Sequence, residues 1–543
     1  MKVAAAAEEF DYIIVGGGSA GCVLASRLSE KPQTRVLLLE EGPSDNTVWV
    51  RMPVGTFKLL GTKRSFVFKT EPEPHAKGRS LVVPQGRMLG GGSSINGGVY
   101  IRGQREDYDD WRDLGCSGWG YDDVLPWFRK CEGNARLAGP YHGTEGPLKV
   151  TDMPHRHPLS EACLRATQET SAFLNHDIPY NHDFNGATQD GVGFYQVTQQ
   201  GGERGSTARY YLRDSGAMRR PNLAVKHDAL VARIIFEGNR ATGVAYRSNG
   251  GAEIEARAKA EIVLSAGAFG SPKILMLSGI GPAAHLKEHG IEVIGDAAEV
   301  GANFQDHISA PVWGRLKQPI GLLGHEKGLK GLKHFLEWML FRTGLLTSNI
   351  VESGGFFDLD GDGRPDVQFH FMPLIRGETA QKTPQVHGVT VQPNLLECRS
   401  RGEVRLRSRD PAALPVFKGN YLADPEDMAC LLRGVRFARR ILKSPSLAKL
   451  VAEEILPGEA TPDEDAPLEE HIRATAKTVF HPTSTCRMGS DPGAVVDTKL
   501  RLRGFAGIRV ADASIMPKIT RGNTNAPSIM IAERAADFIV RST

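Results

Sequence analysis

The stretch DYIIVGGGSAGCVLASRLSE, residues 11–30, decides the fold. Its first five residues form a short apolar, β-rich run, glycines follow, and apolar residues then recur at helical spacing. This order predicts a strand, a tight turn and a helix. A second apolar run, RVLLLE at 35–40, predicts a further strand and completes a βαβ unit. We therefore predict an α/β protein with a parallel sheet.

Three glycines of this stretch, Gly16, Gly18 and Gly21, have the spacing GxGxxG. In such a turn the first glycine permits the bend, the second lets a pyrophosphate approach the backbone, and the third lets the helix pack closely on the strand. Glu40 ends the second strand, where a carboxylate is placed to bind ribose hydroxyls. The unit predicts a dinucleotide site, with a purely structural turn as the alternative, and does not separate FAD from NAD.

Composition excludes several classes of protein. Hydrophobic residues make up 41% and charged residues 24%, which is typical of a globular chain. The net charge is +3 and no basic block stands out, so we expect no nucleic-acid partner. Seven scattered cysteines without a CxxC argue against disulfides and zinc and favour the cytoplasm. The chain contains no run of 18 apolar residues, so we expect no membrane-spanning helix. Peripheral contact with a membrane stays open.

The rest of the chain predicts a discontinuous nucleotide-binding domain with a second, strand-rich domain threaded between its pieces. Strand-like runs at 222–236, 241–246 and 260–265 extend the first domain. Helical patterns at 330–342 and 426–444, with alternating strands between them, mark the second. The predicted boundaries are 9–155, 205–310 and 475–543 for the nucleotide-binding domain, and 156–204 and 311–474 for the other.

Five further segments carry a family resemblance. They are GRMLGGGSSINGGVYIRG (86–103), GAFGSPKILMLSGIGP (267–282), VGANFQDH (300–307), FHPTSTCRMG (480–489) and RVADASIMPKITRGNTNAPSIMIAERAADFI (509–539). Together with the N-terminal unit they closely resemble the glucose–methanol–choline (GMC) oxidoreductases, a family of FAD enzymes, from end to end. The likeness is to a bacterial branch that includes choline, aliphatic-alcohol and L-sorbose dehydrogenases, and the sorbose-type likeness extends across 141–150 and 183–196. The resemblance implies a GMC-type Rossmann-like FAD-binding domain with an inserted strand-rich α+β substrate-binding domain.

The resemblance also implies how FAD is held. Several glycine-rich loops would offer backbone N–H donors to two phosphates and a flat ring. The residues it assigns to FAD are Gly16, Gly18, Ser19, Ala20, Gly21, Glu40, Arg87, Gly91, Ser94, Asn96, Gly97, Val231, Asp512 and Ala513. Some relatives attach FAD covalently through a histidine in the second glycine motif. Ile95 stands at that place here, so we predict non-covalent FAD.

Two residues are implied as catalytic. His481, in FHPTSTCRMG, matches the family's catalytic histidine, and a neutral imidazole is suited to proton transfer. Asn525, in NTNAP, is matched to the second catalytic position, where its amide would donate to the alcohol oxygen. Asn523 is predicted to brace the same turn. Pro527 is predicted to be the first residue of the last helix, whose positive end would lie near the flavin.

Glu352 and His370 match pocket positions of choline-type relatives, although Glu352 is equally explained as a structural hydrogen-bonding acid. We find no aromatic cage for a quaternary ammonium, so choline is not favoured. DLDGDGRPD (358–366) imitates a calcium loop, but Phe369 occupies the place of the bidentate carboxylate, and we predict no metal.

The predicted function is FAD-dependent oxidation of a primary alcohol or polyol to the carbonyl. A base removes the hydroxyl proton, a hydride moves to flavin N5, and the electrons pass to a quinone or another carrier. Three alternatives stay open. They are an oxidase returning electrons to oxygen, for which Gly97 would leave room; a hydroxynitrile lyase, which shares the fold; and a simple NAD-binding protein.

Overall fold

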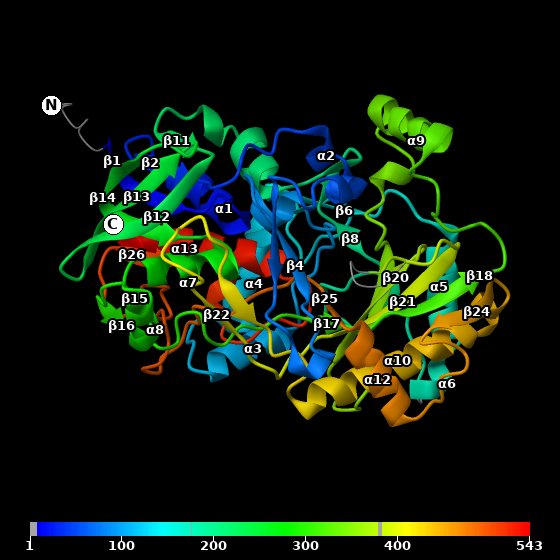
Figure 1. The fold of residues 1–543 in the computed structure, drawn as a ribbon. Helices are drawn as coiled ribbons and strands as arrows, with labels where there is room; N and C mark the ends of the chain where they lie inside the picture. Colours follow the sequence, from blue (N-terminus) through cyan, green and yellow to red (C-terminus); the bar gives the residue numbers. More distant parts are fainter. Residues whose placement is uncertain (1–7, 175, 378–382, 543) are drawn as a thin grey trace.

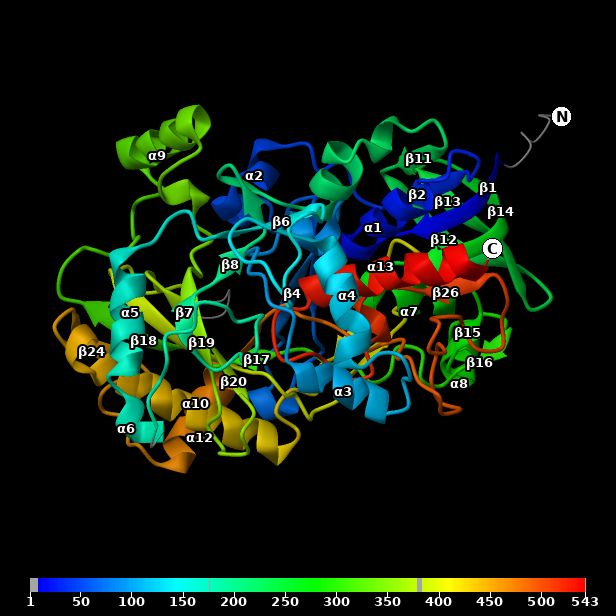
Figure 2. The ribbon, with the colours of Figure 1, turned by 180° about the vertical axis from the view of Figure 1, so that it is seen from behind.

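The computed structural model describes residues 8–174, 176–377 and 383–542. Two large sheets, each with its own helices, lie side by side, and the connecting segments run between them (Figures 1 and 2). The seven cysteines are free and buried.

The first sheet has seven strands. They are β1 (Glu8–Val15), β2 (Val36–Leu39), β11 (Leu223–Lys226), β12 (Ala229–Glu237), β13 (Arg240–Ser248), β14 (Glu253–Leu264) and β26 (Ile508–Val510). The order is β11-β2-β1-β14-β13-β12, with β26 beside β14. The β11, β2, β1, β14 and β26 pairings are parallel, whereas β12 and β13 form an antiparallel edge. The run at 222–236 is two strands, because Asp228 adopts a left-handed conformation (φ +53°) between them.

The helix that follows the glycine turn packs against the last helix of the chain. The helices of this half are α1 (Ser19–Leu28), α3 (Arg105–Asp113), α4 (Tyr121–Cys131), α7 (Gly267–Leu277), α8 (Ala283–Glu288) and α13 (Asn525–Ser542). α1 packs on α13, and the Arg27 guanidinium donates to the buried Glu533 carboxylate at 2.8–3.0 Å. α1 is buried on nearly every side, which is why its apolar residues do not form a single stripe.

The second sheet has eight strands. They are β7 (Gly191–Phe194), β17 (Ile308–Ser309), β18 (Val312–Leu316), β19 (Ser353–Phe357), β20 (Val367–Met372), β21 (Gly388–Leu395), β24 (Val451–Leu456) and β25 (Lys477–Thr478). The order is β24-β18-β21-β20-β19-β7, with β17 beside β21 and β25. β17 and β25 fall within the segments predicted for the nucleotide-binding domain, yet they pair with the second sheet. The chain therefore crosses between the two halves at these points.

The two faces of the second sheet differ in polarity. The helices of this half are α5 (Pro158–Gln168), α6 (Ser171–Leu174), α10 (Pro425–Lys443), α11 (Pro445–Ala448) and α12 (Asp465–Thr475). In β20, Phe369 packs edge-on against Phe437 of α10, with ring centroids 5.5 Å apart. Because side chains alternate along a strand, Gln368 and His370 point to the opposite face. Both are buried, so that face carries polar groups inside the protein.

Shorter elements complete the chain. They are β3 (Ser65–Lys69), β4 (Val82–Gly86), β5 (Glu132–Asn134), β6 (Leu148–Asp152), β8 (Gln196–Val197), β9 (Gln199–Gln200), β10 (Glu203–Arg204), β15 (Ile280–Gly281), β16 (Gly295–Asp296), β22 (Glu403–Arg405), β23 (Val416–Lys418), α2 (Val48–Arg51) and α9 (Gly328–Phe341). α9 projects from the body of the molecule in both views (Figures 1 and 2). Across the described ranges, no helix is both long enough and apolar enough to cross a bilayer.

Candidate active site

The glycines of the two motifs allow two loops to touch. Gly16 has φ +98°, and a Cβ there would lie 2.6 Å from the Ser265 carbonyl oxygen. A Cβ at Gly21 would lie 1.9 Å from the Gly16 carbonyl oxygen, so this position holds α1 close to the turn. A Cβ at Gly91 would lie 2.7 Å from the Gly18 Cα. Side chains at these positions would push the loops apart.

Three further glycines have room for a side chain among the described protein atoms. A Cβ at Gly92 would meet no described atom within 4 Å, and the nearest atoms would be 3.8 Å away at Gly18 and 3.9 Å away at Gly97. None of the three has a positive φ. Neither conformation nor packing explains these glycines, whereas close approach of a ligand to the backbone does. The cradle fits a flat, phosphate-bearing cofactor.

Two helix N-termini meet at this cradle. The Asn525 amide, in the first residue of α13, donates to Ser19 Oγ, in the first residue of α1, at 2.8 Å. The free N–H groups and the positive ends of both helix dipoles favour an anion there. α13 begins at Asn525, two residues before the start predicted from Pro527.

Glu40 lies at the end of β2, as a ribose-binding acid requires. Its two oxygens accept hydrogen bonds from the backbone N–H groups of Gly17 and Gly42, each at 2.8 Å. Burial, and then the negative charge of Glu41, raise the pKa of this carboxyl to about 7, although the two backbone hydrogen bonds oppose them.

The other residues assigned to FAD shape the surrounding loops. Asp512 accepts from the Gly267 N–H at 2.8 Å and from Ser271 Oγ at 2.6 Å, which joins the end of β26 to the start of α7. The remaining contacts are Arg87 Nε to Glu41 Oε1 at 3.0 Å, Ser94 Oγ to the Leu89 carbonyl at 2.7 Å, Gly98 N–H to Asn96 Oδ1 at 3.0 Å, and Ser484 N–H to the Ala513 carbonyl at 3.2 Å. Ala20 is buried in α1, and Val231 lies in β12 opposite Tyr246.

His481 stands against a second histidine that the sequence analysis gave no role. Its Nδ1 lies 2.9 Å from His307 Nδ1, and His307 Nε2 lies 3.1 Å from the Leu396 carbonyl oxygen. A carbonyl only accepts, so His307 Nε2 carries the proton. Burial lowers the pKa of His307 to about 4, so its Nδ1 is a bare acceptor. His481 therefore donates from Nδ1, and its unprotonated Nε2 is the nitrogen that can accept a proton.

The surroundings keep His481 neutral. Burial, and then the neighbouring His307 and His370, lower its pKa well below the usual range of histidine. The His481 backbone N–H donates to Asp306 Oδ1 at 2.7 Å, and the Tyr421 hydroxyl donates to the other oxygen of Asp306 at 2.9 Å. Burial raises the pKa of Asp306 to about 7, against these hydrogen bonds.

The amide that contacts the His481 ring belongs to Asn523 and not to Asn525. Asn523 Nδ2 lies 3.2 Å from His481 Nε2. Gln368 Nε2 donates to Asn523 Oδ1 at 3.3 Å, which turns the N–H side of the amide toward the ring. His481 and Asn523 are both partly exposed, so a small molecule can reach them. The sequence did hold a signal: Asn525 lies two residues before Pro527, where an asparagine belongs to the helix start.

Glu352 is held by four donors and is fully buried. Oε1 accepts from His155 Nδ1 at 2.8 Å and from Ser348 Oγ at 2.7 Å. Oε2 accepts from the His157 backbone N–H at 2.6 Å and from Ser160 Oγ at 2.8 Å. A carboxylate has about four acceptor sites, so these donors occupy it. Burial alone would raise its pKa, but the donors outweigh burial and lower it.

His370 differs, because within the described part of the chain its Nε2 has no hydrogen-bond partner. The ring stands perpendicular to Tyr195, with centroids 6.1 Å apart. Burial, and then the nearby Lys477 and His307, lower the pKa of His370 to about 3. A neutral, buried and unpaired ring nitrogen beside the His481–His307 pair is available to a substrate hydroxyl.

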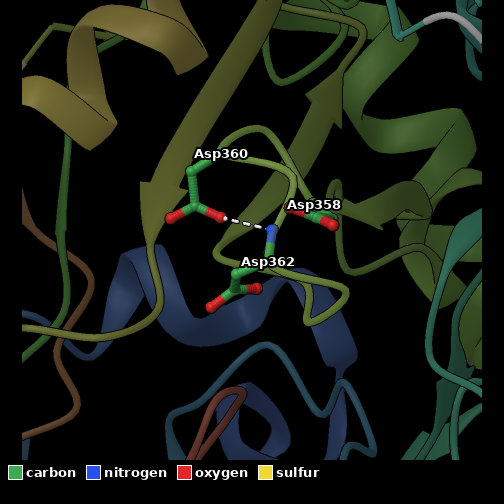
Figure 3. A group of neighbouring side chains, drawn as sticks. All are labelled: Asp358, Asp360 and Asp362. Atoms are coloured by element: carbon green, nitrogen blue, oxygen red, sulfur yellow. Dashed lines mark hydrogen bonds between the residues drawn. The ribbon is translucent and has the colours of Figure 1, made fainter.

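The calcium-like loop lies on the surface. The carboxylates of Asp358, Asp360 and Asp362 come close together (Figure 3). The loop's own backbone uses them: Asp358 accepts from the N–H groups of Gly361 at 2.6 Å and Gly363 at 2.8 Å, and Asp360 accepts from the N–H of Asp362 at 3.3 Å. These hydrogen bonds are those of a tight polar turn.

Comparison with known proteins identifies the family. A family model described as GMC oxidoreductase matches residues 10–309, and a second one with the same description matches residues 398–532. The chain is a GMC oxidoreductase. The GMC oxidoreductases are FAD-binding flavoproteins that act on CH–OH donors, as predicted from the motifs.

Relatives cover nearly the whole GMC chain. An alcohol dehydrogenase (acceptor) of Pseudomonas putida is 45% identical over 540 residues, covering 98% of this chain and 96% of the relative. An oxygen-dependent choline dehydrogenase of Brucella anthropi is 40% identical over 546 residues, with 98% and 96% covered. Among solved structures, pyridoxine 4-oxidase from Mesorbium loti has a TM-score of 0.87 at 29% identity, covering 97% of this chain and 98% of that one. The formate oxidase structure has a TM-score of 0.91 at 27% identity, with 99% of both chains covered. The predicted fold class is thereby confirmed.

Proposed function

We propose that this GMC oxidoreductase oxidises a neutral primary alcohol or polyol to the carbonyl and passes the electrons to a quinone or another carrier. The observation that carries the neutral substrate is the state of Glu352, whose four acceptor sites are occupied by His155, His157, Ser160 and Ser348. A substrate ammonium N–H could bond to Glu352 only by displacing one of these buried donors, leaving that donor unpaired at a cost of about 1–3 kcal/mol, and a quaternary ammonium has no N–H with which to do so. A neutral alcohol requires no such exchange.

The reaction divides between the cofactor and the protein. When bound, FAD takes up the hydride that leaves the carbinol carbon. His481 Nε2 accepts the hydroxyl proton, because it is the unprotonated ring nitrogen and the Nδ1–H is held by His307. Asn523 donates from Nδ2 to the oxygen as negative charge develops there. Loss of one proton to His481 and one hydride from carbon leaves a carbonyl, so the balance closes.

His370 is the residue we assign to binding a further part of the substrate. Its unpaired, buried Nε2 gains a partner when a second hydroxyl of a polyol or a bound water reaches it. A partner for His370 Nε2 is thus available in a polyol substrate, and a bound water can take the same place when the substrate has a single hydroxyl.

We base the proposed electron acceptor on the names of the relatives. The 45% identical relative is named an alcohol dehydrogenase with an unspecified acceptor, whereas relatives about 40% identical are named oxygen-dependent choline dehydrogenases. We place the enzyme in the cytoplasm, at the face of a membrane where quinone is dissolved. The rival is an oxidase, for which the space beside Gly97 supplies room for oxygen.

One assay tests substrate and acceptor together. The holoenzyme is given aliphatic and benzylic primary alcohols, sorbose and choline, with a soluble quinone or with air alone, and kcat/KM is compared. We expect a neutral alcohol with quinone to be preferred. Choline giving the highest kcat/KM would overturn the substrate class, and equal turnover in air would overturn the acceptor. His481→Ala should keep FAD and lose roughly 10²–10⁴ in turnover.

A further inference from the structure

α9 carries its apolar residues on the outside. Leu329, Leu332, Leu336 and Leu340 follow one another at helical spacing and lie on one side of the helix. In a helix of a globular protein such a stripe faces the core, but here Leu329 is 86% and Leu340 70% exposed. Met339 and Phe341 are exposed as well. We call Leu329, Leu332, Leu336, Met339, Leu340 and Phe341 the α9 face.

The opposite side of the helix is what fastens it to the protein. Trp338 is the buried residue of α9, and its indole N–H donates to the Gly202 carbonyl at 2.8 Å. Phe335 packs against Trp49 of α2, with ring centroids 6.3 Å apart. These contacts hold the helix in one orientation, and the α9 face therefore points into solvent.

Positive charge borders the α9 face. Lys330 and Lys333 project from the same helix, and within the described ranges neither forms an ion pair. The acids of the segment, Glu326 and Glu337, lie beside Lys327 at 3.7 Å and His334 at 3.9 Å. An apolar stripe with a cationic edge matches the acyl region and the anionic headgroups of a bilayer surface.

The helix is also close to the reaction site along the chain. A short turn at Leu345–Thr347 follows α9, and Asn349 then donates from Nδ2 to the Gly97 carbonyl at 2.7 Å. Gly97 is one of the glycines that border the open cradle. A short segment of chain therefore links α9 to a residue that contacts the cradle.

We propose that the α9 face docks this enzyme on an anionic phospholipid bilayer, lying in the interface without crossing it. The benefit to electron transfer rests on the proposed function, because a lipid-dissolved quinone would then reach the flavin side of the protein. The docking itself does not depend on which alcohol is oxidised.

Vesicle binding tests the proposal. Holoenzyme is sedimented with vesicles of equal phosphatidylglycerol and phosphatidylcholine, and with pure phosphatidylcholine. We expect binding to the mixed vesicles that weakens with salt. Replacing Leu332, Leu336 and Leu340 together by Gln should weaken binding at least about 100-fold, since three leucines lose their apolar burial. Lys330→Gln with Lys333→Gln should weaken it about 30-fold on mixed vesicles only.

A matched control uses exposed apolar residues elsewhere. Leu114→Gln with Ile294→Gln removes side chains that are 55% and 45% exposed and should leave vesicle binding unchanged. Turnover with a soluble acceptor should be equal in all variants, which shows that they are folded and keeps this test separate from the proposed function. The proposal would be wrong if the wild-type protein did not sediment with the anionic vesicles. A leucine variant that binds like the wild type would also overturn it, as would a stable wild-type dimer that the leucine variant converts to monomer while neither binds vesicles.

Discussion

Asn523 and Asn525, which lie in the GNTN segment at residues 522–525, give the sharpest test of the site. Asn523→Ala removes the amide that lies 3.2 Å from His481 Nε2 and that would donate to the developing alkoxide. Loss of one such donor costs about 2.7–4 kcal/mol, so the rate of flavin reduction should fall about 10²–10³-fold. Asn525→Ala removes a 2.8 Å hydrogen bond to Ser19, worth about 0.5–1.5 kcal/mol. It should weaken FAD binding about 2- to 13-fold and leave the rate of reduction near that of wild type at saturating FAD.

The assay is anaerobic stopped-flow reduction of the bound flavin at saturating alcohol, with FAD affinity measured separately by flavin fluorescence. Gln368→Leu serves as an intermediate variant, because it removes the donor that orients the Asn523 amide but leaves the amide present. We expect its rate to lie between those of wild type and Asn523→Ala. If Asn525→Ala slowed reduction as much as Asn523→Ala with FAD saturated, the assignment of Asn523 would be wrong.

Three further predictions concern pH, the cofactor and stability. The surroundings lower the pKa of His481, and the neutral ring is the active form. As the pH is lowered, kcat/KM should therefore stay constant until the pH is below about 6.5, the usual pKa of histidine. A fall in kcat/KM that begins above that pH would contradict this. Ile95 has no nucleophilic atom, so heat or acid precipitation should release yellow FAD to the supernatant, and flavin left in the pellet would refute non-covalent binding. Burial alone would lower the pKa of His142, but hydrogen bonds to Asp183 and Glu132 outweigh it and raise the pKa. That stability is present below the unfolded pKa of about 6.5 and is lost as pH rises through the folded value, so the Tm gap between wild type and His142→Gln should shrink from pH 6 to pH 9.

The nucleotide-binding half was predictable because its signals are local. A strand, a glycine turn and a helix follow one another within residues 11–30, and the structure forms β1 and α1 there. The strand DVQFHF was also evident from its alternation, and β20 covers Val367–Met372. Single-residue roles in the site depended on contacts between distant segments, which no local pattern contains.

The His307–His481 pair shows this limit. The two residues are 174 positions apart, and their contact is set by the pairing of β17 with β25. Asn525 meets Ser19 across 506 positions, and the local signal for this contact was its place two residues before Pro527. The sequence left Glu352 open as a pocket acid or a structural acid, because one of its donors, His155, lies 197 positions away along the chain.

The β17–β25 ribbon holds the two paired histidines on a different part of the fold from His370, which bears on how the enzyme can evolve. Ile308 pairs with Thr478 and Ser309 with Lys477, so His307 and His481 lie on neighbouring segments of one short antiparallel ribbon. The Val479 N–H donates to the His307 carbonyl at 2.9 Å and extends that ribbon to His307. His370, in contrast, is carried by β20, a separate strand. Substitutions at His370 can therefore change which alcohol is accepted while the backbone pairing that holds His307 and His481 together is retained.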